Sequence, residues 1–245
     1  MADAATTFEP AEDKKPALVL VPGLICTGDL WAFQIAALKE VTAITVVDHR
    51  AAGSLSELAA QILDDQPGPF ALAGHSMGGY VAFEVMRQAG DRVTKLALIA
   101  TSARQDTLEM AARRRDFIKL AQRGKFRGVS PLLMKTFIHE DALDNKALRE
   151  TVYRMAHKTG AEGFIRQSEI ILERPDSRGD LANISCPTLV LCGDADERTP
   201  PALAGEMAAG IADSELVILP RCGHLPQLER PAATTRALKA WLDVE

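Results

Sequence analysis

Short apolar runs rich in β-branched residues recur along the chain, and segments with helical spacing separate them. The runs are continuous rather than alternating, which is typical of strands buried on both faces of a parallel sheet. Six such runs are present: 17–21 (ALVLV), 43–47 (AITVV), 70–73 (FALA), 95–100 (KLALIA), 188–192 (TLVLC) and 215–219 (ELVIL). Five segments place apolar residues on one helical face: 29–40, 55–64, 79–89, 201–209 and 232–242. This alternation predicts an α/β fold, with a mostly parallel sheet of about six strands and helices on both faces.

Residues 104–180 break the alternation, because no strand pattern occurs among them. Helical patterns occur instead near 104–122, 126–138, 144–158 and 161–173, with Gly124 and Gly160 in the connections. A helical segment of this length between two strands is expected to lie on top of the sheet rather than within it. The chain therefore divides into a loose polar tail at 1–16, a core formed by 17–103 and 181–245, and a helical insertion at 104–180.

Charge is unevenly distributed between the insertion and the rest of the chain. The 245 residues carry a net charge of −5, which makes nucleic acid a poor candidate partner, since its binding depends on neutralising phosphates. The insertion holds 16 basic and 12 acidic residues, whereas the remainder holds 12 and 21. A basic insertion favours an anionic substrate or an acidic carrier protein, and the alternative is a solvated helical surface with no binding role.

The N-terminus and the cysteines indicate a cytoplasmic protein without a membrane segment. The first 16 residues are polar and acidic, and they lack the basic and apolar regions of a signal peptide. The longest apolar run, 17–26, is interrupted by Pro22 and Gly23, and it is about half as long as a membrane-spanning helix. The cysteines form no C-x-x-C pair, so we expect reduced thiols that pack in the interior: Cys26, Cys186, Cys192 and Cys222.

The sharpest chemical signal is the sequence GHSMGG at 74–79, which directly follows the strand at 70–73 and precedes a helix. It matches the G-x-S-x-G nucleophile motif in the strand-turn-helix context that the motif requires. In this context the Ser76 hydroxyl projects from the sheet edge with a helix N-terminus behind it. The alternative is a glycine-rich turn with a capping serine.

A serine nucleophile needs a general base and an acid that orients the base. Of the five histidines, His224 follows the last strand, at the edge where parallel sheets place their sites. His75 is expected to point away from its neighbour Ser76, and His49 is a candidate for lining the cleft. The remaining two are expected to be surface or insertion residues: His139 and His157.

Two aspartates, Asp194 and Asp196, follow the strand at 188–192, and by position both are candidates for the acid. The order of serine, acid and histidine along the chain is the one expected for the G-x-S-x-G motif. With these segments in place, the chain resembles the α/β-hydrolase superfamily over nearly its whole length. The matching segments are GHSMGG at 74–79, GDADERTP at 193–200, CGHLPQLERP at 222–231 and, less closely, DHRAAGS at 48–54 and VPGL at 21–24.

The resemblance implies a catalytic triad. In relatives with the pattern G-x-x-D the acid is the aspartate three residues after the glycine, which here is Asp196. The implied triad is therefore Ser76, Asp196 and His224, and Asp194 remains the alternative acid.

The resemblance also implies an oxyanion hole and a lid. The segment VPGL is similar to the family's oxyanion loop, with Pro22 where many members have histidine, and the implied donors are the backbone N–H groups of Leu24 and Met77. The insertion at 104–180 falls where the family carries its lid. Its phenylalanines are expected to form a core of their own, with an acyl pocket as the alternative for one or two of them: Phe117, Phe126, Phe137 and Phe164. The family usually begins with a β-hairpin, but the short polar tail allows at most one irregular strand near 6–8.

The implied activity is that of a serine-dependent carboxylic ester hydrolase that forms an acyl-enzyme intermediate. Its substrate is expected to be a small to medium ester, lactone or thioester, with anionic and carrier-protein-linked substrates as options. No metal or organic cofactor is required. On the same triad, the alternatives are a C–C bond hydrolase, a lyase-type synthase or an acyl transferase. An alternative of another class is a non-catalytic ligand receptor on the same fold.

Overall fold

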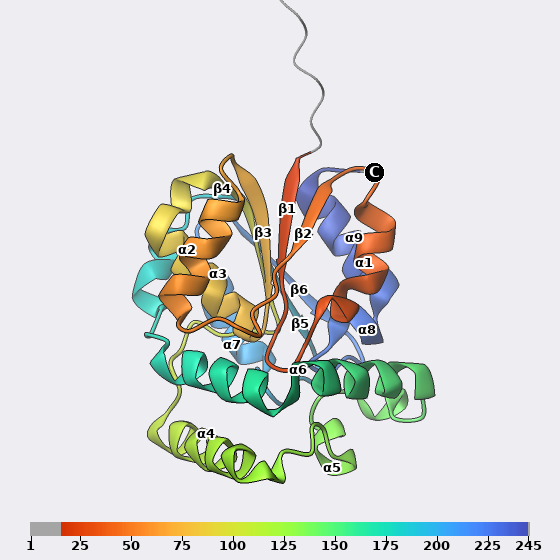
Figure 1. Ribbon diagram of the computed structural model, residues 1–245. Coiled ribbons are helices and arrows are strands. Elements are labelled where there is room, and N and C mark those ends of the chain that lie inside the picture. The colour runs from red at the N-terminus through yellow and green to blue at the C-terminus, as the bar shows by residue number, and fades with distance from the viewer. Residues whose placement is uncertain (1–15, 245) are drawn as a thin grey trace, which may run out of the picture.

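Six strands form one sheet in which all neighbours run parallel, in the order β2-β1-β3-β4-β5-β6 (Figure 1). This computed structural model describes residues 16–244. The strands are β1 Ala17–Val21, β2 Ala43–Val46, β3 Phe70–His75, β4 Val93–Ile99, β5 Thr188–Gly193 and β6 Ser214–Leu219. Each strand coincides with an apolar run found in the sequence, so the prediction of a parallel α/β sheet is confirmed. The irregular strand expected near residues 6–8 lies outside the described residues.

Helices cover both faces of the sheet (Figure 1). One face packs against α1 Ala32–Leu38 and α9 Pro231–Leu242, and the other against α2 Leu55–Asp65, α3 Met77–Ala89 and α7 Pro201–Gly210. Successive strand residues point to opposite faces: in β1, Leu18 and Leu20 join the first core, whereas Val19 and Val21 join the second. Because both faces are covered, the inner strands β1, β3 and β5 are apolar and almost entirely buried, whereas the edge strands β2 and β6 are partly exposed.

The strand order places a crevice at the carboxyl ends of β1 and β3. These two strands are neighbours, but β1 continues into β2 on one side while the later strands lie on the other side. Loops that leave the sheet in opposite directions open a crevice at such a switch point. The segments that leave the sheet there are the loop at 22–27, after β1, and the turn at Ser76, after β3.

The insertion between β4 and β5 lies across the carboxyl ends of the strands (Figure 1). Its helices are α4 Leu108–Leu120, α5 Pro131–Met134 and α6 Lys146–Glu173. The helices predicted at 144–158 and 161–173 are both present as parts of α6, with non-helical angles at Gly160 (φ 66°, ψ −177°) between them. The helix predicted at 126–138 is mostly wrong, because Gly128 has a φ of 64° and Ser130 caps a new helix that begins at Pro131.

Two further features bear on the expected environment of the protein. None of the helices within residues 16–244 is both long enough and apolar enough to cross a membrane. The four cysteines are buried and free of disulfide bonds.

Candidate active site

Ser76 occupies a strained backbone conformation between β3 and α3. Its φ of 52° and ψ of −114° are unfavourable for a residue with a side chain. Its backbone N–H donates to the Ile99 carbonyl at 2.9 Å, and the Thr101 hydroxyl donates to the Ser76 carbonyl at 2.7 Å. The turn also requires glycine nearby, since a Cβ at Gly74 would lie 2.3 Å from the Gly78 carbonyl oxygen. The surrounding structure therefore maintains the strained turn.

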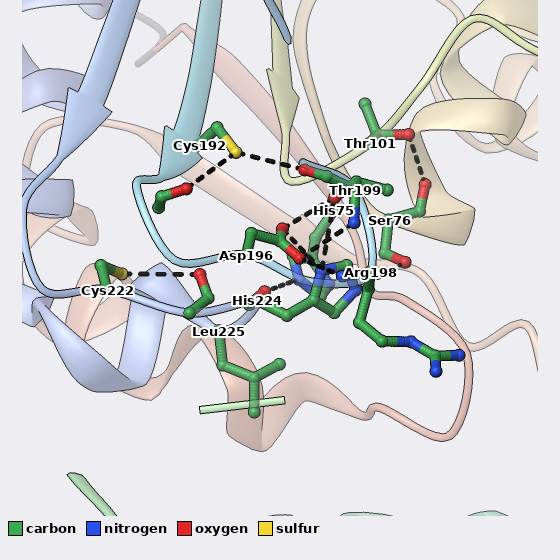
Figure 2. A network of polar contacts seen from close by, with 12 residues as sticks. His75, Ser76, Thr101, Cys192, Asp196, Arg198, Thr199, Cys222, His224 and Leu225 are labelled. Atoms are coloured by element: carbon green, nitrogen blue, oxygen red, sulfur yellow. Dashed lines mark hydrogen bonds and ion pairs between the residues drawn. The ribbon is translucent and has the colours of Figure 1, made fainter. Parts of the chain in front are cut away.

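His224 links this serine to a carboxylate (Figure 2). Its Nε2 lies 3.0 Å from Ser76 Oγ, and its Nδ1 lies 2.8 Å from Asp196 Oδ2. Ser76 follows β3, Asp196 follows β5 and His224 follows β6, and the three side chains meet at the carboxyl edge of the sheet. His224 and Asp196 are buried, whereas Ser76 is half-buried. In this arrangement Nδ1–H donates to the carboxylate while Nε2 is free to accept the serine proton.

Asp196 accepts hydrogen bonds from three groups besides His224. The backbone N–H groups of Arg198 and Thr199 donate to its Oδ1 at 2.8 and 2.9 Å, and the Thr199 hydroxyl donates to Oδ2 at 2.7 Å. Burial alone would raise the pKa of Asp196, but His224 and the hydrogen bonds outweigh burial and lower the pKa to about 2. The carboxylate is therefore ionised at neutral pH.

The other candidate acid, Asp194, has a different place. It is exposed, and its Oδ1 accepts the backbone N–H of Cys222 at 3.1 Å. It therefore contacts the loop that precedes His224 rather than the imidazole ring.

Two buried side chains hold the loop that carries His224. Glu229, at the end of the short helix α8 Pro226–Glu229, accepts the N–H groups of Gly223 and Leu225, each at 3.0 Å. His75 donates from Nε2 to the His224 carbonyl at 2.9 Å, and the two rings lie 5.1 Å apart. Burial, followed by the charge of His224, lowers the pKa of His75 to about 3, so its ring stays neutral. His75 therefore packs against the base, not against the neighbouring serine.

The loop at 22–27 lies against the serine turn, where a Cβ at Gly23 would be 3.1 Å from Ser76 Cβ. Within residues 16–244, the backbone N–H groups of Leu24 and Met77 have no protein acceptor. Met77 begins α3, and the N-terminus of a helix favours negative charge. Two free donors beside a serine are an arrangement that can hold an oxyanion.

The phenylalanines of the insertion divide between two environments. Phe126 and Phe164 pack together, with ring centroids 5.1 Å apart, whereas Phe117 is 46% exposed. Phe137 instead faces the triad, with its ring 6.1 Å from that of His224 and with the Arg198 guanidinium 5.4 Å from its centroid. Figure 2 shows Arg198 reaching past the triad from the loop that carries Asp196.

The remaining histidines lie away from the serine. His49 is buried and its Nδ1 lies 2.9 Å from Nε2 of Gln167, and burial lowers the pKa of His49 to about 4. His157 lines a cavity of about 720 Å³ in the insertion, and the His139 backbone N–H donates to Glu229 at 2.7 Å.

The cysteine thiols near the site are buried. Burial raises the pKa of the Cys26 thiol to about 12, and burial also raises the pKa of Cys222. Both thiols are therefore protonated at neutral pH. No group of three or more histidine, cysteine, aspartate or glutamate side chains in the described part of the chain could hold a metal ion.

Three buried polar residues of this site were not singled out from the sequence. Thr199 and Glu229 lie within the segments 193–200 and 222–231, which match the family's motifs. Their position in these motifs was the only sequence feature that could have marked them as site residues. Gln167 lies in α6 with no local motif, and only the fold brings it beside His49 and the loop at 22–27.

Comparisons with known proteins agree with the fold. A family model described as the alpha/beta hydrolase family matches residues 18–237. The chain is 28% identical to a pimeloyl-[acyl-carrier protein] methyl ester esterase of Nitrosomonas europaea, over 88% of this chain and 91% of that protein. A solved structure of a thermophilic esterase from Thermogutta terrifontis, with malate bound, superposes with a TM-score of 0.86 at 29% identity and covers 94% of this chain and 90% of that one. The enol-lactonase from Burkholderia xenovorans LB400 shares the fold, with a TM-score of 0.85 at 24% identity over 94% of this chain and 92% of that chain. With a family model that spans most of its length, the chain belongs to the alpha/beta hydrolase family.

Proposed function

We propose that this protein is a serine-dependent hydrolase that cleaves a small to medium carboxylic ester, lactone or thioester through an acyl-enzyme intermediate. The observation that carries the proposal is the position of His224, 3.0 Å from Ser76 Oγ on one side of its ring and 2.8 Å from Asp196 on the other. Relatives named as esterases support the same class of reaction.

In the first half of the reaction, Ser76 Oγ attacks the substrate carbonyl carbon while His224 Nε2 takes the hydroxyl proton. Asp196 holds Nδ1–H and stabilises the imidazolium. The carbonyl oxygen becomes an oxyanion that accepts hydrogen bonds from the N–H groups of Leu24 and Met77. Each such donor is worth about 2.7–4 kcal/mol in the transition state.

In the second half, the tetrahedral intermediate collapses and the bond to the leaving group breaks. His224 returns its proton to the leaving oxygen or sulfur, which departs. Water then enters, gives a proton to His224 and attacks the acyl carbon. The bond between the acyl carbon and Ser76 Oγ breaks, His224 returns the proton to Oγ, and the carboxylic acid is released. The insertion at 104–180 acts as a lid that covers the acyl group and limits access of bulk water.

An anionic substrate is the finer part of the proposal, and unpaired arginines near the triad support it. Burial of part of its side chain, then the charges of Arg114 and Arg113 on α4, lower the pKa of Arg198. Arg114 is paired with Asp106 at 2.8 Å, but within residues 16–244 no carboxylate forms an ion pair with Arg198 or Arg113. Arg198 therefore lies near two further arginines and has no ion-pair partner of its own within residues 16–244, which favours a bound anion beside it.

Two relatives point the same way. The Nitrosomonas europaea protein is named for an ester carried by an acyl-carrier protein, and the Thermogutta terrifontis structure contains malate, a dicarboxylate. We therefore expect the substrate to carry a negative charge at a distance from the scissile carbonyl, either as a free carboxylate or on an acidic carrier.

Chromogenic acyl esters of varied chain length, assayed with wild type and Ser76→Ala, test the reaction. We expect Ser76→Ala to lower kcat/KM by at least about 10³-fold and to abolish labelling by a fluorophosphonate. Ser56→Ala, an exposed serine on α2, is the matched control and should behave as wild type. A wild type that neither turns over esters nor reacts with the fluorophosphonate would contradict the proposal and favour a receptor.

Two esters that differ only in a terminal carboxylate or carboxamide test the charge preference. We expect wild type to favour the carboxylate, and added salt to reduce the preference because screening weakens charge interactions. Arg198→Met should lose the preference, whereas Arg236→Met on α9, on the opposite side of the sheet from α7, should keep it. Equal rates for both esters in wild type would refute an anionic small-molecule substrate.

A further inference from the structure

The loop beside the serine contains a second strained residue, which the proposed mechanism does not use directly. The Cys26 N–H donates to the Gly23 carbonyl at 3.0 Å, which closes a reverse turn with Leu24 and Ile25 at its centre. Ile25 has a φ of 55°, whereas Leu24 is not among the residues with positive φ. A positive φ at the third position alone is the pattern of a type II turn, which favours glycine there. A β-branched isoleucine in this conformation is unfavourable and needs support from elsewhere.

The support comes from the insertion. Gln167 in α6 is fully buried, and its Oε1 accepts the Ile25 N–H at 2.9 Å across a sequence separation of 142 residues. The Gln167 Nε2 lies 2.9 Å from His49 Nδ1, in the loop after β2. Because the Ile25 N–H needs an acceptor, the Gln167 amide must present its oxygen to Ile25 and its NH₂ group to His49. His49 Nδ1 must therefore be unprotonated and accept the hydrogen bond from the Gln167 NH₂ group.

The same helix contacts both loops at other points. The Lys158 ammonium lies 2.9 Å from Asp29, just after the oxyanion loop, and Arg166 Nε donates to the Arg50 carbonyl at 2.9 Å, just after His49. These partners are exposed, so they contribute little by themselves. The buried contact from Gln167 is the one that reaches the strained residue.

We propose that Gln167 is a positioning residue for the oxyanion hole. By holding the Ile25 N–H, it fixes the Leu24–Ile25 peptide in the orientation of a type II turn. This holds the backbone of Leu24 in place, and the Leu24 N–H, which belongs to the preceding peptide and has no protein acceptor within residues 16–244, stays directed to the side of Ser76. This inference rests on the proposed function, because it assigns the Leu24 N–H to the developing oxyanion. It also means that the insertion supplies part of the geometry of the reaction centre and does more than cover it.

Gln167→Met tests the inference, because methionine has a similar length and fills the buried space but cannot accept the Ile25 N–H. We expect kcat to fall about 10- to 100-fold, up to the loss seen when an oxyanion donor is removed, with KM changed by less than about threefold. Affinity for a boronic acid that mimics the tetrahedral intermediate should fall in parallel with kcat. Arg166→Met is the matched control on the same helix turn: it removes a contact with the His49 loop but not with Ile25, and it should keep kcat near wild type.

A rescue separates positioning from general support of the fold. Glycine adopts a positive φ without strain, so adding Ile25→Gly to Gln167→Met should restore a large part of kcat. Failure of this rescue, with both variants folded, would overturn the inference.

Hydrogen exchange of the Ile25 amide supplies a readout that needs no activity. We expect the Ile25 N–H to be protected in wild type and to exchange faster in Gln167→Met; an unprotected amide in wild type overturns the inference even where the variant fails to fold. If the Ile25 amide is protected but the protein shows no Ser76-dependent turnover, the turn is formed as described and only the proposed function is refuted.

Discussion

Replacing the triad carboxylate by an amide, Asp196→Asn, tests the arrangement of the site with almost no change in shape. Asp196 receives four donors: two backbone N–H groups on Oδ1, and the Thr199 hydroxyl and His224 Nδ1–H on Oδ2. Asparagine offers one acceptor oxygen and one NH₂ group. If its oxygen keeps the two backbone donors, its NH₂ group faces His224 Nδ1. That nitrogen must then become an acceptor, which moves the ring proton to Nε2, opposite Ser76.

The expected loss follows from this change of tautomer. With a proton on Nε2, His224 cannot accept the serine proton, so we expect kcat to fall about 10⁴-fold, or about 5.5 kcal/mol in the activation barrier. The variant should also lose stability at neutral pH. A pKa lowered from 3.8 to about 2 contributes about 2 kcal/mol to the free energy of unfolding above pH 4, and this contribution disappears as pH falls towards 2.

Steady-state kinetics on the best chromogenic ester, with active sites counted by fluorophosphonate, measure the effect on kcat. Urea unfolding at several pH values measures the effect on stability, and the difference between wild type and variant should shrink below pH 4. Asp194→Asn is the matched control, since Asp194 contacts the Cys222 N–H and not the imidazole. A folded Asp196→Asn protein with kcat within tenfold of wild type would refute this account of the base.

Three further outcomes follow from close contacts and buried groups. Gly78→Ala would place a methyl group 2.1 Å from the Val21 carbonyl oxygen, so we expect a loss of at least about 2 kcal/mol, visible as a lower Tm in thermal unfolding. Thr199→Val removes a hydroxyl donor from the triad carboxylate, and we expect about a fivefold lower kcat with little change in KM; an unchanged kcat would contradict this role. The pKa values of His49 and His75 are lowered from 6.5 to about 4 and about 3, so between pH 7 and 5 the unfolded chain binds protons that the folded chain does not. Urea unfolding should therefore show the free energy of unfolding fall by about 2 kcal/mol per histidine as the pH is lowered from 7 to 5. A free energy of unfolding that does not change over this range would contradict the burial of these rings as neutral groups.

The sheet was predictable because its strands obey a simple rule. A strand covered by helices on both faces must be apolar throughout, and runs such as 17–21 and 188–192 begin at the same residues as β1 and β5. The helices of the insertion were harder to predict. Gly160 was expected in a connection, and the backbone does leave helical angles there, but the turn at Gly128 that divides the segment 126–138 was not expected.

Ser76, Asp196 and His224 could be predicted to lie together because each belongs to a motif at the end of a strand, and parallel strands end at one edge of the sheet. The groups that support them could not be predicted from the sequence. Gln167 reaches Ile25 across 142 positions, and no local pattern distinguishes this glutamine from any other helical glutamine. His75 was expected to turn away from the serine, and its contact with the His224 carbonyl depends on a loop 149 residues later.

The break at Gly160 has a practical consequence for anyone who would exchange the insertion to change which molecules the enzyme accepts. The part of α6 beyond the break carries Gln167, whose buried side chain contacts Ile25 in the loop beside Ser76. A graft that swaps the whole of 104–180 discards the contact between Gln167 and Ile25. A graft that ends at Gly160 exchanges the segment before the break and leaves Gln167 in place.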